Sequence, residues 1–350
     1  MSGSLAVTWF QHRRTKELCA GLDIELVVLA TNLRGPLRYL VLGVRTLALL
    51  ARRRPEVLLV QNPSLILAAL GVAVRGVLSY RLIVDAHNEA VVPFMNRQRS
   101  VKLLSRWVIR KSDLTIVTNR HLAALVDGWG GRAFTLPDRV PSPPATTSTR
   151  ALAGLFNVVL IAAHAADEPI AEVLAAVRGT DLQLYVTGDP RRLDSDVAAG
   201  ALPNVRFMGF LQEEDYWALL RSADGIVDLT RMDNCLVCGA YEALALGKAM
   251  LLSNNAASIE LFGRAAIFTN NTAADIRRGI EGLRLGRAQL EAEAERKRIE
   301  LAERWSSSAR DLVVSMGHRA GGFSAPAHEL KLGTDLNRVR DICSTLDDER

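Results

Sequence analysis

Residues 224–254 read DGIVDLTRMDNCLVCGAYEALALGKAMLLSN, and they contain the pattern that recurs along the whole chain. The two short apolar runs at 225–230 and 249–254 have the length and composition of strands that are buried on both faces. A polar loop and a predicted helix over 237–246 lie between them. A strand, a helix and a second strand in this order form the unit of a parallel sheet that is covered by helices.

The same alternation extends in both directions from this stretch. Apolar runs predict further strands at 5–10, 24–31, 56–62, 81–88 and 114–119 in the first half, and at 156–163, 182–188, 205–210 and 265–270 in the second. Helices are predicted over 37–53, 64–77, 100–111, 120–128, 168–178, 213–222 and 272–300. The predicted fold class is therefore α/β, with two doubly wound, Rossmann-like parallel sheets.

A proline-rich segment separates the two halves. DRVPSPPATTSTR at 138–150 has three prolines within four positions, which removes backbone donors, and its Ser/Thr cluster has little to bury. We expect an N-terminal domain at 1–145 and a C-terminal domain at 146–317. The charged segment 286–304 is predicted as a solvated surface helix. Residues 318–350 are predicted as a loosely ordered tail with one short helix near 335–345.

Composition narrows the class of protein. The chain has no run of about 20 uncharged apolar residues, and its first charges follow the short apolar stretch, which is the wrong order for a signal peptide. We expect a cytoplasmic protein. Its four cysteines do not make a disulfide framework. Cys235 and Cys238 form a C-x-x-C, but no second ligand pair follows at zinc spacing.

Charge differs strongly between the halves. Residues 1–150 hold 21 Lys and Arg against 9 Asp and Glu, whereas residues 151–350 hold 22 against 29. The helices predicted at 37–53 and 100–111 combine arginines with leucines, and the second also contains Trp107. This composition suits peripheral contact with an anionic membrane. It equally suits helices that pack their apolar faces on the sheet and expose only their cations. Nucleic-acid binding is disfavoured because aromatic residues are not interleaved with the basic ones.

Residues just after the strands are the first candidates for a site, because ligands of open parallel sheets bind beyond the carboxyl strand ends. The helix that begins near Gly239 presents free N–H groups that suit a diphosphate. Glu242, in the first turns of that helix, can accept hydrogen bonds from ribose hydroxyls. An acid favoured only by the helix dipole would look the same in the sequence, and the pattern leaves both interpretations open.

The second half resembles the donor domain of the glycosyl transferases group 1 family. The resemblance is carried by GAYEALALGK (239–248), NVRFMGFL (204–211) and DYWALLRSAD (215–224), and it covers 156–317. It implies the GT-B fold, in which two Rossmann-like domains face a cleft, and it implies a nucleotide-sugar donor as substrate. It also implies that Glu242 binds the donor ribose, and that Gly209 and the backbone of Gly239, Ala240 and Tyr241 line the same pocket. His87 would face the sugar and the acceptor, as a base or as a hydrogen-bonding partner of the sugar.

The sequence also departs from the family pattern. Many members carry a second glutamate eight positions before the first, and here that position is Asn234. The loop after the first strand of the second half reads AAHAADEP and lacks the usual cation, so Arg231, Arg191 and Arg192 become the candidates for contact with a diphosphate. No D-x-D motif follows the strands of the second half, and we expect no essential metal and no further cofactor.

These observations favour transfer of a sugar to a glycan or polyprenyl-linked acceptor in the assembly of bacterial cell-surface polysaccharides, at the inner face of the plasma membrane. A lipid-linked acceptor would account for both the basic charge and the apolar helices of the first half. Two alternatives stay open. One is a nucleotide-sugar epimerase or phosphorylase on the same fold, and the other is a non-catalytic GT-B subunit, which the asparagine and the missing cation would allow.

Overall fold

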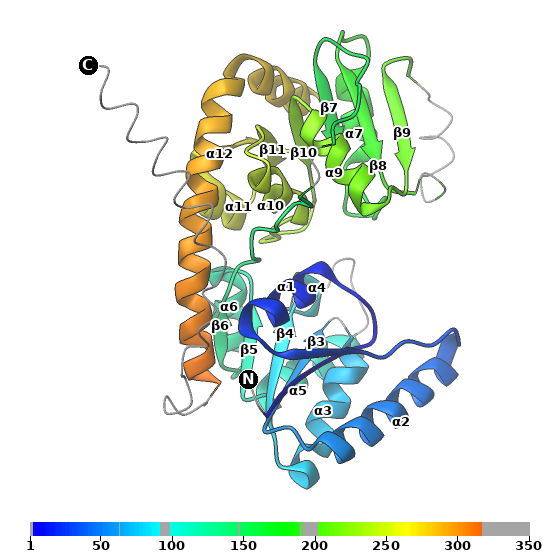
Figure 1. Ribbon diagram of the computed structural model, residues 1–350, viewed down its shortest axis with the longest axis vertical. Helices are drawn as coiled ribbons and strands as arrows, with labels where there is room; N and C mark the ends of the chain where they lie inside the picture. The colour runs from blue at the N-terminus through cyan, green and yellow to red at the C-terminus, as the bar shows by residue number, and fades with distance from the viewer. Residues whose placement is uncertain are drawn as a thin grey trace, which may run out of the picture. The chain divides into compact units, whose positions relative to one another are not determined.

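The computed structural model describes residues 3–62, 64–91, 99–145, 148–189, 191 and 202–316. Within these residues the chain forms two six-stranded sheets, and neighbouring strands of each sheet run parallel. Figure 1 shows helices flanking both sheets. The predicted α/β class with two doubly wound parallel sheets is confirmed.

The first sheet has the strand order β2-β1-β3-β4-β5-β6. Its strands are β1 (Ser4–Thr8), β2 (Glu25–Val28), β3 (Val57–Asn62), β4 (Arg81–Ala86), β5 (Leu114–Val117) and β6 (Ala133–Thr135). The helices are α1 (Arg13–Leu22), α2 (Gly35–Arg53), α3 (Leu65–Leu78), α4 (Asn88–Val91), α5 (Arg99–Lys111) and α6 (Arg120–Gly128). Strands β1, β3 and β5 are buried along their whole length, which is why they read as continuous apolar runs.

The second sheet has the strand order β12-β11-β10-β7-β8-β9. Its strands are β7 (Asn157–Leu160), β8 (Gln183–Thr187), β9 (Val205–Gly209), β10 (Gly225–Asp228), β11 (Met250–Ser253) and β12 (Ala266–Thr269). The helical elements are α7 (Ile170–Val177), α9 (Glu213–Ser222), α10 (Cys238–Ala245), α11 (Ala256–Phe262), the 3-10 turn η2 (Gly263–Ala265) and α12 (Ala273–Ser315). Residues 224–254 contain β10, α10 and β11, and β10 is one of the two central strands of this sheet.

Five of the described elements were not predicted. Helix α1 has few apolar residues, and α11 follows its strand too closely to stand out as a separate periodic segment. The other three, α4, β6 and η2, are only three or four residues long. The domain limits at 145 and 146 stay a prediction, and the predicted tail at 318–350, with its short helix, lies outside the described residues.

Helix α12 differs from the prediction in its length and in its packing. It continues to Ser315, and it is not a purely solvated helix over 286–304. Ala294 and Leu301, seven positions apart, are buried in the core that covers the second sheet. Two apolar side chains on one stripe are enough to bury one side of a helix, although the segment as a whole is highly charged. Farther along, Trp305 packs against Gly21 of α1, where a side chain would collide with the indole ring.

Candidate functional site

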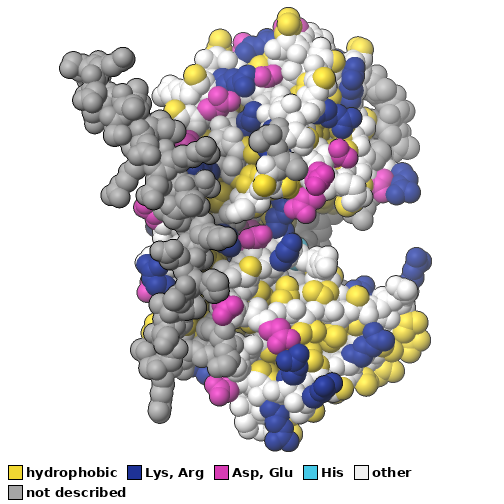
Figure 2. Space-filling view, viewed as in Figure 1, with side chains coloured by type: hydrophobic (Ala, Val, Ile, Leu, Met, Phe, Trp, Pro, Cys, Tyr) yellow, Lys and Arg dark blue, Asp and Glu magenta, His cyan; other side chains and the backbone are white. Residues whose placement is uncertain are grey.

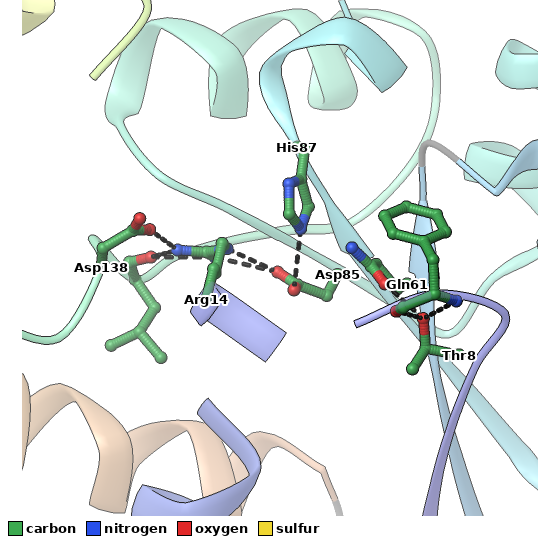
Figure 3. Close-up of polar contacts among 8 residues, drawn as sticks. Thr8, Arg14, Gln61, Asp85, His87 and Asp138 are labelled. Atoms are coloured by element: carbon green, nitrogen blue, oxygen red, sulfur yellow. Dashed lines mark hydrogen bonds and ion pairs between the residues drawn. The ribbon is translucent and has the colours of Figure 1, made fainter. Parts of the chain in front are cut away.

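Polar side chains gather at the carboxyl ends of β1, β3 and β4 (Figure 3). Thr8 ends β1 and donates a hydrogen bond to Gln61 in β3, and Gln61 lies opposite Asp85 of β4 in the sheet register. The loop after β1 leads into α1, whose second residue, Arg14, points back toward Asp85. Three neighbouring parallel strands therefore bring residues from distant parts of the sequence to one edge of the sheet.

Arg14 is almost fully buried and is held between two carboxylates. Its Nε donates to Asp85 Oδ1 at 2.9 Å, and its Nη1 donates to Asp138. The Leu136 carbonyl accepts from the same guanidinium at 3.3 Å. Burial would raise the pKa of Asp85, but Arg14 and the nearby His87 outweigh it and hold that pKa below its ordinary value. Asp85 is therefore charged at neutral pH despite its burial.

Two histidine rings lie beside this ion pair. His87 Nε2 is 3.5 Å from Asp85 Oδ2, and the rings of His12 and His87 meet edge to face with 4.3 Å between their centroids. Burial, together with the neighbouring His87, lowers the pKa of His12 to about 4, against the opposing effect of Asp138 and Asp85. His12 is therefore a neutral imidazole at pH 7, which can accept a proton or a hydrogen bond.

Several buried polar atoms around the histidines lack a hydrogen-bond partner among the described residues. They are His12 Nδ1, Gln61 Nε2, His87 Nε2 and both amide heteroatoms of Asn62 and of Asn88. Buried polar groups are normally paired, and a concentration of unpaired donors and acceptors at strand ends suits a ligand with several hydroxyl groups.

Glu242, the residue predicted to bind the donor ribose, lies on α10 beside the second sheet and is almost fully buried. One of its carboxylate oxygens accepts a hydrogen bond from Arg13, and the other accepts one from the Tyr216 hydroxyl of α9. Burial raises the pKa of Glu242, while Arg13 and Tyr216 act in the opposite direction. Both oxygens of this carboxylate are therefore engaged by other side chains of the protein, and its role as a ribose ligand stays a prediction.

Arg13 is the cation beside this carboxylate, and it is the first residue of α1, directly after the loop that follows β1. Its guanidinium also lies 5.5 Å from the centre of the Trp217 ring and 3.9 Å from Glu213. The side chain is 36% exposed, so it can turn toward a ligand without first being released from a packed core. No local sequence pattern connects Arg13 with Glu242, because 229 positions separate the two residues.

The start of α10 is shaped by a second buried acid. The Gly239 N–H donates to Asp228 Oδ2 at 2.8 Å, and a side chain at position 239 would collide with that carboxylate. Burial raises the pKa of Asp228 well above its ordinary value, although the Gly239 N–H opposes the shift. Asp228 ends β10, so this contact ties the strand end to the first turn of the helix. Glycine at 239 is needed for that close approach.

The other predicted site residues take different places. Ala240 and Tyr241 point into the core, where the Tyr241 ring packs edge to face on Phe262 at 5.4 Å, so only their backbone could face a ligand. Gly209 has φ +68° at the end of β9, with open space beside it. Asn234 has φ 55°, and its carbonyl accepts from Asn119 Nδ2 at 2.9 Å.

The candidate cations of the second half are engaged elsewhere. Arg231 donates to Glu172 at 2.6 Å and to the Glu168 carbonyl at 3.0 Å. Arg191 pairs with its neighbour Asp189 on the surface, and Arg192 lies outside the described residues. In the described part of the chain no hydrogen bond or ion pair links Arg231 or Arg191 to Glu242, and no group of three His, Cys, Asp or Glu residues could hold a metal ion.

Comparison with known proteins establishes the fold. No protein-family model and no curated protein matches the chain. Among solved structures, sucrose-phosphate synthase from Thermosynechococcus elongatus is 16% identical with a TM-score of 0.71, and the alignment covers 89% of this chain and 98% of that one. HepE from Anabaena, in complex with UDP and glucose, is 12% identical with a TM-score of 0.67 over 90% and 98% of the two chains.

A glycosyltransferase from Rickettsia africae is 10% identical with a TM-score of 0.62, over 89% of this chain and 97% of that one. These likenesses show that the chain has the GT-B fold, which the resemblance implied. At such low identities they show the fold alone.

Proposed function

We propose that the chain is a glycosyltransferase that moves a sugar from a nucleotide-sugar donor to a hydroxyl group of a glycan or polyprenyl-linked acceptor. The observation that carries this proposal is Glu242, a buried carboxylate near the start of α10 whose two oxygens are held by Arg13 and Tyr216. Carboxylates in this position bind ribose hydroxyls in other nucleotide sites. The solved structures with the same fold include HepE in complex with UDP-glucose, which supports a donor of this class.

Arg13 would supply the cation for the diphosphate, which the loop after the first strand of the second half lacks. In the proposed reaction the bond from the sugar to the nucleoside diphosphate breaks, and negative charge develops on the diphosphate oxygen. A guanidinium beside the ribose ligand can turn to that oxygen and stabilise it through charge-assisted hydrogen bonds. This would supply the cation that the loop at 162–169 lacks, which is one of the two features that allowed a non-catalytic subunit, and the other, Asn234, is not affected by it.

The strand-end cluster of the first sheet supports an acceptor site. The unpaired atoms of Gln61, Asn62 and Asn88 suit the hydroxyl groups of a glycan. His87 would take the proton of the attacking hydroxyl or hydrogen-bond the transferred sugar, and Asp85 would hold its ring in position from 3.5 Å. We include in the proposal a cytoplasmic location and a role in the assembly of bacterial cell-surface polysaccharides. No helix among the described residues is long and apolar enough to cross a membrane.

A thermal-shift screen tests the donor half of the proposal. Purified protein is heated with UDP, GDP or ADP and with their sugars, because a ligand that binds the native state raises its melting temperature. We expect one nucleotide to stabilise the wild type and to lose this effect in Glu242→Gln. Glu25→Gln serves as the control, since Glu25 is also paired with an arginine, Arg53, but lies on the edge strand β2 of the first sheet. If no nucleotide stabilises the protein, the non-catalytic alternative replaces the proposal.

A product assay with the identified donor tests the transfer itself. Sugar appearing on an added glycan or polyprenyl phosphate supports the proposal. Conversion of the donor sugar without any acceptor would instead show an epimerase. Loss of transfer in His87→Ala, with nucleotide stabilisation retained, would support the role of His87 in the chemical step.

A further inference from the structure

Helix α2 has two apolar faces, and only one of them packs against the protein. Leu42, Thr46 and Leu50 are buried, and the two leucines belong to the apolar core of the first sheet. Leu37, Leu40, Val44 and Leu47 are 37% to 63% exposed. At 3.6 residues per turn the second set lies on the opposite side of the helix from the first. Leu33, which lies two residues before the helix begins, is also exposed, and we call these five side chains the α2 stripe.

Arginines lie along one side of the α2 stripe. Arg38, Arg45 and Arg52 are seven positions apart, a spacing that places them in one row along the helix. Between Glu25 and Glu56 the sequence contains six arginines and no acidic residue. Figure 2 shows hydrophobic and basic side chains together on the part of the surface where Figure 1 draws α2.

We propose that the α2 stripe is a docking surface for an anionic lipid bilayer, with the helix lying in the plane of the interface. A continuous row of leucine and valine beside a row of arginines is the composition of helices that rest on acidic lipid. The helical part of the stripe, from 37 to 47, is about 15 Å long at 1.5 Å per residue, about half the thickness of the hydrocarbon core, which suits a helix that lies on a membrane better than one that spans it.

A second copy of the chain is a poorer occupant. Two copies related by a two-fold axis would each present the same surface to the other. The arginine rows would then face like charges without a single acid on either helix to pair with them. Anionic head groups supply the missing negative charge, and the acyl region accepts the apolar side chains.

The position of α2 also relates the membrane surface to the acceptor site. Trp9, in the loop after β1, is buried and donates from Nε1 to Thr46 Oγ1 of α2 at 3.0 Å. The same loop continues to His12, and α1 begins directly after it at Arg13. If the proposed function holds, a lipid-linked acceptor would approach the strand-end cluster from a membrane held by the neighbouring helix. The docking surface itself does not depend on that function, and its test uses no donor.

Vesicle co-sedimentation of the full chain tests the proposal. One set of vesicles contains phosphatidylcholine alone, and the other also contains about 30 mol% phosphatidylglycerol, which gives it the negative surface charge of an anionic membrane. We expect binding to the anionic vesicles that weakens as salt is raised, and little binding to the neutral ones. The triple variant Leu37→Ser/Leu40→Ser/Val44→Ser should weaken binding at least about tenfold, since it removes three partly exposed apolar side chains. The variant Arg38→Gln/Arg45→Gln/Arg52→Gln should lose about fivefold for each cation that faces lipid.

The control is Leu155→Ser/Leu285→Ser, which removes two leucines that are more exposed than any in the α2 stripe but lie elsewhere. It should bind vesicles like the wild type, and this variant and the apolar triple variant should keep the wild-type melting temperature because the side chains they change are exposed. Equal binding by the wild type and the apolar triple variant would overturn the proposal, as would absence of binding to anionic vesicles at low salt. A concentration-dependent dimer in sedimentation equilibrium that the triple variant abolishes would show that a second copy covers the stripe.

Discussion

Replacing Arg13 with methionine should change the binding of a nucleoside and of its diphosphate in opposite directions. Arg13 donates to the Glu242 oxygen that the proposal assigns to a ribose hydroxyl, so it competes with the nucleoside for that oxygen. The same guanidinium would contact the diphosphate once the nucleotide is bound. Methionine keeps an unbranched apolar chain beside Trp217 but removes the charge.

The expected magnitudes follow from the exposure of the side chain. Because Arg13 is 36% exposed, its pair with Glu242 contributes no more than about 1 kcal/mol, as partly solvated pairs do. Loss of the competing arginine should therefore tighten nucleoside binding by up to about fivefold. A charge-assisted hydrogen bond to phosphate contributes about 1.5–3 kcal/mol, so the Kd of the diphosphate should rise about 10- to 150-fold.

Isothermal titration calorimetry with uridine and UDP, or with the pair chosen by the thermal-shift screen, measures both constants. Arg75→Met is the matched control, because Arg75 is 37% exposed and pairs with Asp113 at 3.0 Å in the first sheet's helix layer. Equal weakening of both ligands by Arg13→Met would mean that Arg13 only supports the structure. If Arg231→Met weakens the diphosphate and Arg13→Met does not, the diphosphate cation is Arg231, as predicted from the sequence, and the reasoning about Arg13 is refuted.

Four further outcomes are expected. Arg14→Met leaves two buried carboxylates without their cation and should lower the free energy of unfolding by about 3–5 kcal/mol in urea titrations; a loss under about 1 kcal/mol would contradict the buried pairing. His12 has its pKa lowered to about 4 in the folded state, so between pH 6.5 and pH 4 only the unfolded state takes up its proton. The wild type should lose about 1–3 kcal/mol over that range, and His12→Asn should show a flatter profile when the urea midpoint is followed against pH; parallel profiles would rule out this contribution. Gly239→Ala should lower the unfolding free energy by about 1–3 kcal/mol, because the new methyl group has no room beside the Asp228 carboxylate; an unchanged midpoint would show that the strand end adapts. His87→Ala should lower kcat by about 10²–10⁴ while the nucleotide Kd stays unchanged, and a loss confined to nucleotide affinity would argue against a role in the chemical step.

Local pattern was sufficient for most of the fold. Each predicted strand lies at an apolar run, and the observed strands keep the apolar core of that run and omit its polar ends, as in β10 and β11. The exceptions are short or polar elements such as β6 and α1, in which few apolar residues mark the period. The prediction that residues 286–304 form a solvated helix was wrong. Ala294 and Leu301 are buried because the core of the second sheet lies beneath them, and the number of charged residues in a segment does not reveal such a contact.

The site was predictable only in part. The resemblance named His87 as a candidate, and its place at the end of a predicted strand agrees with the edge at which parallel sheets bind ligands. The contact between His87 and Asp85 was found only in the structure. The sequence also identified Glu242 through its place on the helix after β10. It could not identify Arg13 and Tyr216 as the partners of that carboxylate, since no periodicity links positions so far apart.

The sequence by itself determined the α/β class, the order of the elements and the helix on which Glu242 lies, because these follow from apolar period and turn composition, which are local properties. The tertiary structure decided which charges meet. Only packing shows that Arg14 lies between two acids and that Arg231 forms an ion pair with Glu172. Packing also shows that the exposed leucines of α2 face away from the core. Burial and ion pairing depend on distances between remote segments, and the folded chain sets those distances.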